Sequence, residues 1–162
     1  MEYLTKEQYA YRRESAAKKM VENATIAQER GMTEEQTDIL EELCSFRHDF
    51  HCNMSKLVND NTDTFKELLR IREELVKSGL PKLDIGKFDE GLYIDIDDFQ
   101  VVYESEQVPD NDTEEFDEWY EKTYSRIYDE LSELHKMIED YLSSIDKKYG
   151  TKYCPTGALR IY

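Results

Sequence analysis

The feature that most constrains the fold is a long run of apolar side chains near the C-terminal end of the chain. Between Thr113 and Tyr149 these side chains recur at alternating intervals of four and three residues, at Tyr120, Tyr124, Ile127, Leu131, Leu134, Ile138, Tyr141 and Ile145. This spacing places them on one face of an α-helix, as in a coiled coil. Gly150 follows, and glycine favours a helix end. The pattern predicts one long helix that packs on other helices of this chain or on a second copy, and we favour packing within a single domain.

Two further helices are predicted from capping boxes, in which a threonine side chain and a glutamine three residues later satisfy backbone groups at a helix start. The first box is Thr5-Lys6-Glu7-Gln8, and its helix is expected to run to Gly31. The second is Thr33-Glu34-Glu35-Gln36, and its helix is expected to end by Asn53.

Another helix is predicted from Thr64 to about Gly79, where glycine and a following proline favour a stop. Its inward side chains are expected to be Leu68, Leu69, Ile71, Leu75 and Val76.

The period then changes to that of a half-buried strand. Apolar and polar residues alternate over 92–96, and residues 99–103 can return against them as a hairpin. Residues 159–162 can add an edge strand. We therefore expect an α+β fold that is mostly α: a helical bundle with a long C-terminal helix and a small antiparallel β-hairpin or sheet. Residues 1–162 are expected to form a single domain, with an acidic hairpin insertion at about 82–112.

Charge limits the functions that the chain can have. Its 162 residues include 37 acidic and 21 basic ones, for a formal net charge of −16. This charge argues against a general nucleic-acid binder and fits a protein that docks on a basic partner. We find no apolar run that predicts a membrane span. The cysteines at 44, 52 and 154 predict free thiols or thiolate ligands in a reduced, cytosolic protein.

The segment 44–53 concentrates chemically useful side chains. On a helix, Arg47 lies beside the apolar stripe, and His51, Cys44 and His48 follow around the same flank. Such a border between a buried face and solvent can tune pKa values and admit a ligand. The alternative is that these histidines are ordinary surface or boundary residues.

The C-terminal segment after Gly150 holds a second candidate group. Lys152, Tyr153 and Arg160 supply a cation, an aromatic ring and a planar donor near one another. Single-stranded RNA is bound by this combination of side chains.

These groups suit RNA cleavage without a metal. An imidazole takes the proton of a ribose 2′-OH, a second group protonates the leaving 5′-oxygen, and a cation stabilises the phosphorane. Arg47, His48 and His51 can fill these roles, and the segment after Gly150, called the tail below, can supply Lys152 or Arg160. Which histidine is the acid and which is the base stays open.

Two other chemistries compete for the same residues. Cys44, His48 and His51 share a flank, and Cys154 could complete a structural zinc site, although the spacing matches no standard zinc finger. Cysteine-protease chemistry at Cys44 or Cys154 is less favoured, because no segment resembles an oxyanion hole. We expect no metal and no cofactor.

Four segments also resemble a known family. The strings Phe46-Arg47-His48-Asp49-Phe50-His51-Cys52-Asn53 and Tyr153-Cys154-Pro155-Thr156-Gly157 are its most specific features. The likeness extends over 16–26, 43–53, 141–146 and 150–160, whereas 54–112 aligns poorly. These segments are similar to the small phage-encoded type V-A anti-CRISPR ribonuclease.

The resemblance implies an enzyme that docks near the PAM-reading site of a type V-A CRISPR effector and cuts its bound guide RNA. This chain is then a metal-independent endoribonuclease, a monomer in the cytoplasm of the bacterial host, with no membrane partner. The residues expected to catalyse are Arg47, His48 and His51, and those expected to hold RNA or the effector are Asn53, Lys152, Tyr153 and Arg160. The alternative is a non-catalytic acidic protein that blocks the PAM-binding surface stoichiometrically.

Overall fold

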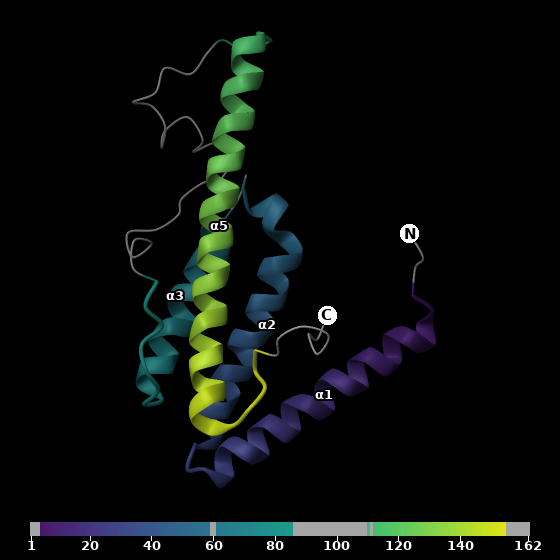
Figure 1. The fold of residues 1–162 in the computed structure, drawn as a ribbon, viewed down its shortest axis with the longest axis vertical. Helices are drawn as coiled ribbons and strands as arrows, with labels where there is room; N and C mark the ends of the chain where they lie inside the picture. Colours follow the sequence, from purple (N-terminus) through teal and green to yellow (C-terminus); the bar gives the residue numbers. More distant parts are fainter. Residues whose placement is uncertain (1–3, 59–60, 86–109, 111, 155–162) are drawn as a thin grey trace.

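The computed structural model describes residues 4–58, 61–85, 110 and 112–154 (Figure 1). They form four helices, which are α1 (Lys6–Glu29), α2 (Glu34–Leu57), α3 (Thr62–Lys77) and α5 (Glu114–Tyr149).

The expected α+β class is wrong for this part of the chain. The described residues contain helices and connecting segments but no strand, so the architecture that they show is a helical bundle. The reason is that every long apolar run within them has the period of a helix, while the alternating run that predicted the hairpin, at 92–103, lies outside the described residues. The expected edge strand at 159–162 lies outside them as well, as does most of the expected insertion.

Both capping boxes form as predicted. Thr5 accepts a hydrogen bond from the backbone N–H of Gln8, and the Gln8 side chain accepts one from the backbone N–H of Thr5. Thr33 and Gln36 make the same reciprocal pair at the start of α2. These local bonds explain why both helix starts can be predicted from the sequence.

Two other helix boundaries differ from the prediction. α2 continues past Asn53 because Met54 and Leu57 extend its buried stripe. The Asn53 side chain donates to the carbonyl oxygen of Asp49, which keeps it within the helix. α3 begins at Thr62 rather than Thr64. The inward face of α3 is mostly as expected, but Val76 is exposed.

The long C-terminal helix is confirmed. Thr113 caps α5 by accepting a hydrogen bond from the N–H of Phe116, and Gly150 ends the helix with a φ of 69°. The apolar face predicted for this helix from Tyr120 to Ile145, called its seam below, is buried from Ile127 to Ile145. Neither α5 nor any other helix in the described ranges is long and apolar enough to cross a membrane.

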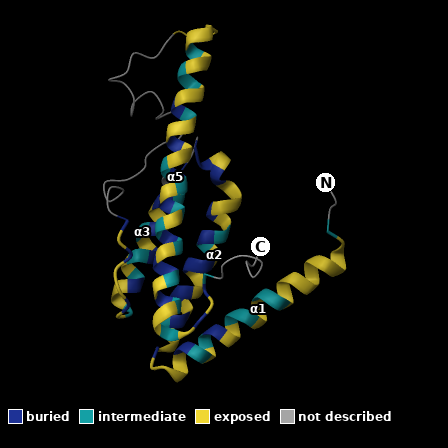
Figure 2. Ribbon diagram, in the orientation of Figure 1, coloured by how far each residue is buried: buried dark blue, intermediate teal, exposed yellow. Residues whose placement is uncertain are grey.

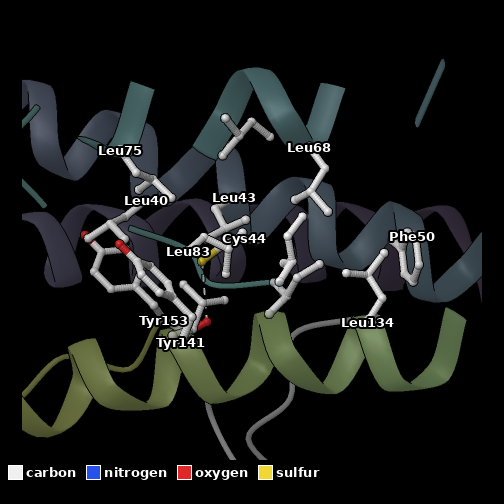
Figure 3. Close-up of a cluster of buried hydrophobic side chains, with 14 of the residues drawn as sticks. Leu40, Leu43, Cys44, Phe50, Leu68, Leu75, Leu83, Leu134, Tyr141 and Tyr153 are labelled. Carbon is white, nitrogen blue, oxygen red and sulfur yellow. Dashed lines mark hydrogen bonds between the residues drawn. The ribbon is translucent and has the colours of Figure 1, made fainter. Parts of the chain in front are cut away.

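α2 lies at the centre of the bundle, where it packs against α1, α3 and α5 (Figure 1). The core between α2, α3 and α5 also receives Leu83 from the segment after α3 (Figure 3). That segment is held by the Tyr141 hydroxyl, which donates to the carbonyl oxygen of Pro81 at 2.8 Å. The predicted seam of α5 therefore packs within this chain.

α1 is attached to the bundle mainly through its C-terminal end. Asn23 and Ala27 are its buried residues, and its earlier turns run away from the other helices and are largely exposed (Figures 1 and 2). Because α1 diverges from α2 in this way, the space between the two helices opens toward the N-terminal end of α1.

Candidate active-site groove

A groove of about 680 Å³ lies between α1 and the middle of α2. Its α1 side includes small residues, Ala16 and Ala17, which leave the space open, together with the larger side chains of Tyr9, Arg12 and Arg13. The other residues that line it are Leu4, Met20, Glu41, Cys44, Ser45, Arg47, His48, Asp49 and Tyr153. The groove thus joins α1, the α2 motif and the start of the C-terminal tail.

Arg47 lines this groove but is held from behind by α5. Its side chain is 7% exposed, and its Nη1 lies 3.1 Å from Oε1 of Glu139. The Nε of Arg47 is buried and has no hydrogen-bond partner among the described residues. A guanidinium in an ion pair is a fixed positive charge at the base of the groove, and it has little freedom to reach toward a substrate.

His48 is the histidine that lines the groove. It is half-buried, at the border that the sequence predicted. Its Nε2 lies 3.8 Å from the Sγ of Cys52, one helical turn away. An accessible imidazole in a groove has the position that general acid–base catalysis requires.

The tail reaches the groove because Asp146 fixes it to the end of α5. The carboxylate of Asp146 accepts hydrogen bonds from the Thr151 hydroxyl at 2.6 Å and from the backbone N–H groups of Tyr153 and Cys154, both at 2.8 Å. In addition, the backbone N–H of Lys152 donates to Oδ1 of Asn23 in α1 at 2.8 Å. These bonds bring the tail between α1 and α2.

Tyr153 is packed into this junction. It is 2% exposed, and its carbonyl oxygen accepts a hydrogen bond from the Cys44 thiol at a distance of 3.4 Å (Figure 3). Burial raises the pKa of its phenol, so it stays neutral at ordinary pH. Tyr153 therefore forms part of the groove floor, and its ring is too buried to stack openly on a base.

The structure gives no support to the two competing cysteine chemistries. Burial raises the pKa of the Cys44 thiol and that of the Cys154 thiol, which disfavours the thiolate needed as a nucleophile. Within the described ranges, no group of three or more His, Cys, Asp or Glu side chains is arranged to hold a metal ion. Cys44, Cys52 and Cys154 are all free thiols.

Other predicted site residues lie elsewhere. His51 is exposed and faces α5, with its ring centroid 5.1 Å from that of His135, and it does not line the groove. Asn53 borders a separate pocket on the α3 side of α2. Lys152 is exposed, and Arg160 lies outside the described residues. The groove therefore brings together Arg47, His48 and Tyr153 but not His51 or Asn53.

Sequence reasoning missed the contribution of α5. His135 and Glu139 are one turn apart, and His135 Nε2 lies 3.7 Å from the Glu139 oxygen that also pairs with Arg47. The available signal was Arg47 itself, because a buried charge is normally paired, so an arginine beside a buried stripe indicates a nearby partner.

Comparisons of this chain with protein-family models, curated proteins and solved structures give no match.

Proposed function

We propose that this chain is an anti-CRISPR endoribonuclease that binds a type V-A CRISPR effector near its PAM-reading site and cuts the bound guide RNA. The observation that carries the proposal is that one open groove is lined by His48, Arg47 and the start of the tail. Arg47 and His48, from the string at 46–53, and Tyr153, the first residue of the string at 153–157, line the same groove although they are distant in the sequence.

The groove can support the first step of RNA transesterification. His48 takes the proton from a ribose 2′-OH, and the 2′-oxygen attacks the adjacent phosphorus. The bond from phosphorus to the 5′-oxygen breaks, that oxygen takes a proton from water, the protonated His48 returns its proton to the solvent, and a 2′,3′-cyclic phosphate remains. The guanidinium groups that line the groove stabilise the phosphorane, because guanidinium matches its charge and geometry. His51 remains a second predicted acid–base residue, although it does not line the groove and instead lies beside His135 of α5.

The net charge of −16 fits the proposed partner. Effectors of this kind hold guide and target in positively charged channels, so an acidic protein is attracted to them even though it has little affinity for free RNA. The chain would act as a monomer in the cytoplasm of the bacterial host.

The test compares His48→Gln with His51→Gln in guide cleavage on the assembled effector. We expect His48→Gln to slow cleavage by roughly 10²- to 10⁴-fold, the usual contribution of a general acid or base, while effector binding is retained. His51→Gln is expected to have the smaller effect because His51 lies outside the groove. Cleavage by His48→Gln at the wild-type rate would rule out this groove as the site.

The second candidate function is a stoichiometric blocker, and the acidic surface between α2 and α3 favours it. A groove of about 500 Å³ there is lined by Asp38, Glu41, Glu42, Asp49 and Glu67, among others. Carboxylates on this surface suit contact with a basic protein surface. A blocker would inhibit one effector molecule per chain, leave the guide intact and keep its potency in His48→Ala.

A further inference from the structure

The exposed charged side chains on the two walls of the groove are opposite in sign. Arg12 and Arg13 lie on the α1 wall, whereas Glu41 and Asp49 lie on the α2 wall. All four side chains are exposed. A polyanion that enters this groove is repelled by the α2 carboxylates and attracted to α1.

Arg12 and Arg13 are available to bind a ligand. Neither forms an ion pair within the described part of the chain. They therefore differ from Arg47, whose charge is offset by Glu139. Two adjacent guanidiniums in a groove provide donor forks for phosphate oxygens, and each charge-assisted bond to phosphate is stronger than one between neutral groups.

An aromatic side chain extends the same wall. Tyr9 is 49% exposed and lines the groove about one turn before Arg12 and Arg13. Exposed rings beside cationic side chains bind single-stranded nucleic acid, since bases stack on the ring while the cations contact the backbone. Lys18 and Lys19 are also basic residues of α1, but they are not among the residues that line the groove.

We infer that the α1 wall of the groove is the binding surface for the sugar–phosphate backbone of single-stranded RNA, with Arg12 and Arg13 on phosphates and Tyr9 on a base. This inference rests on the proposed function and extends it, because it assigns RNA binding to α1 and leaves His48, across the groove, for chemistry. Recognition of this kind is independent of base sequence, which suits a guide whose sequence varies.

The test uses the double variant Arg12→Gln/Arg13→Gln and, as a matched control, Lys18→Gln/Lys19→Gln, which removes the same charge from the same helix. Guide cleavage on the assembled effector is measured in a single turnover, and effector binding is measured separately. We expect the arginine variant to cut at least tenfold more slowly with unchanged effector binding, and the lysine variant to stay close to wild type. Equal rates for the arginine variant and wild type would overturn the inference. Loss of effector binding in the arginine variant would overturn it too, in favour of a contact with protein.

A second readout separates this inference from the proposed function. The effector is loaded with a guide that contains 4-thiouridine, and the complex is irradiated after addition of wild type or the arginine variant. A cross-link to the α1 segment that is lost in the arginine variant supports RNA binding there, even if wild type leaves the guide uncut and the cleavage proposal fails. Cross-links confined to other segments would overturn the inference even where the guide is cut.

Discussion

Arg47 shows how one side chain can be structural and still belong to the candidate site. Its ion pair with Glu139 joins α2 to α5, with side-chain exposures of 7% and 22%. The cost of removing one member of such a pair comes mainly from leaving the other charge poorly solvated. Arg47 therefore positions the motif helix, and its charge contributes to the groove from a fixed place.

We predict that Arg47→Gln lowers the free energy of unfolding by about 3 kcal/mol, because Glu139 loses its partner in a poorly solvated position. Adding Glu139→Gln restores part of this loss, with a coupling energy of about 1–3 kcal/mol. Urea unfolding of wild type, the two single variants and the double variant measures this coupling energy as a double-mutant cycle. Arg70→Gln is the control, since its ion pairs with Glu42 and Glu67 are exposed and are worth at most about 1 kcal/mol. Strictly additive effects of Arg47→Gln and Glu139→Gln would contradict the assigned pair.

The buried thiol of Cys44 makes the stability of the fold depend on pH. Burial raises the pKa of its thiol above the unfolded value of about 8.5. The folded protein therefore keeps this proton at pH values where the unfolded chain has lost it, so stability falls as pH rises above about 8.5. Burial raises the pKa of the Cys154 thiol too and adds to this loss. Burial also raises the phenol pKa values of Tyr141 and Tyr153. These two residues add to the loss of stability only above about pH 10, where an exposed tyrosine titrates.

We expect Cys44→Ala to unfold more easily at pH 7 but to lose less stability than wild type between about pH 8.5 and 10. The difference in slope approaches 1.4 kcal/mol per pH unit for one proton. Urea unfolding in the presence of a reductant measures it across this range. Cys52→Ala, which removes an exposed thiol instead of a buried one, is the matched control. Parallel curves for Cys44→Ala and wild type would contradict the assignment.

At the scale of elements, the helices are predictable where their signals are local. Each capping box, at Thr5 and at Thr33, determines the helix start at which it lies. The apolar spacing of α5 likewise predicts the helix that contains it. The end of α2 differs from the prediction because Met54 and Leu57 are buried by tertiary packing. The sequence does not show this packing, and Asn53 alone indicated an earlier end.

Gly150 connects the end of α5 to the tail, and its φ of 69° favours glycine. We predict that Gly150→Ala lowers stability by roughly 1–2 kcal/mol, the cost of the left-handed conformation for a residue with a Cβ. A Cβ there would also lie 2.8 Å from Nη1 of Arg30, which must move. Gly150→Asn is expected to cost less, because asparagine tolerates this conformation better. Thermal unfolding of both variants tests the order, and an alanine variant as stable as wild type would refute it.

At the scale of the whole molecule, the candidate site depends on contacts that the sequence does not reveal. The motif at 44–53 identified His48 and Arg47, but the Arg47–Glu139 pair joins residues 92 positions apart. His48 and His51 are about one turn apart on α2, yet only His48 lines the groove beside α1, because His51 lies beside His135 of α5. The tail was expected to contribute an open tyrosine, and Asp146 instead turns Tyr153 into the core. Sequence could indicate which residues carry chemistry, while the packing of the helices decides which of them share a groove.

The groove is consistent with the proposal that this acidic protein acts on RNA. Its positive side chains are concentrated on the α1 wall, and the rest of the chain keeps the net charge at −16. Under the proposed function, the overall negative field directs the molecule to a basic partner, and only the α1 wall contacts phosphate.

The central claim is that this chain destroys the guide RNA of its partner by catalysis. The most direct measurement is recovery of the guide from a type V-A effector after incubation with a substoichiometric amount of wild-type protein. The account predicts that nearly all of the guide is cut at one position and that each inhibitor molecule inactivates many effectors. Full-length guide at every dose, with inhibition that saturates at one chain per effector, would contradict it.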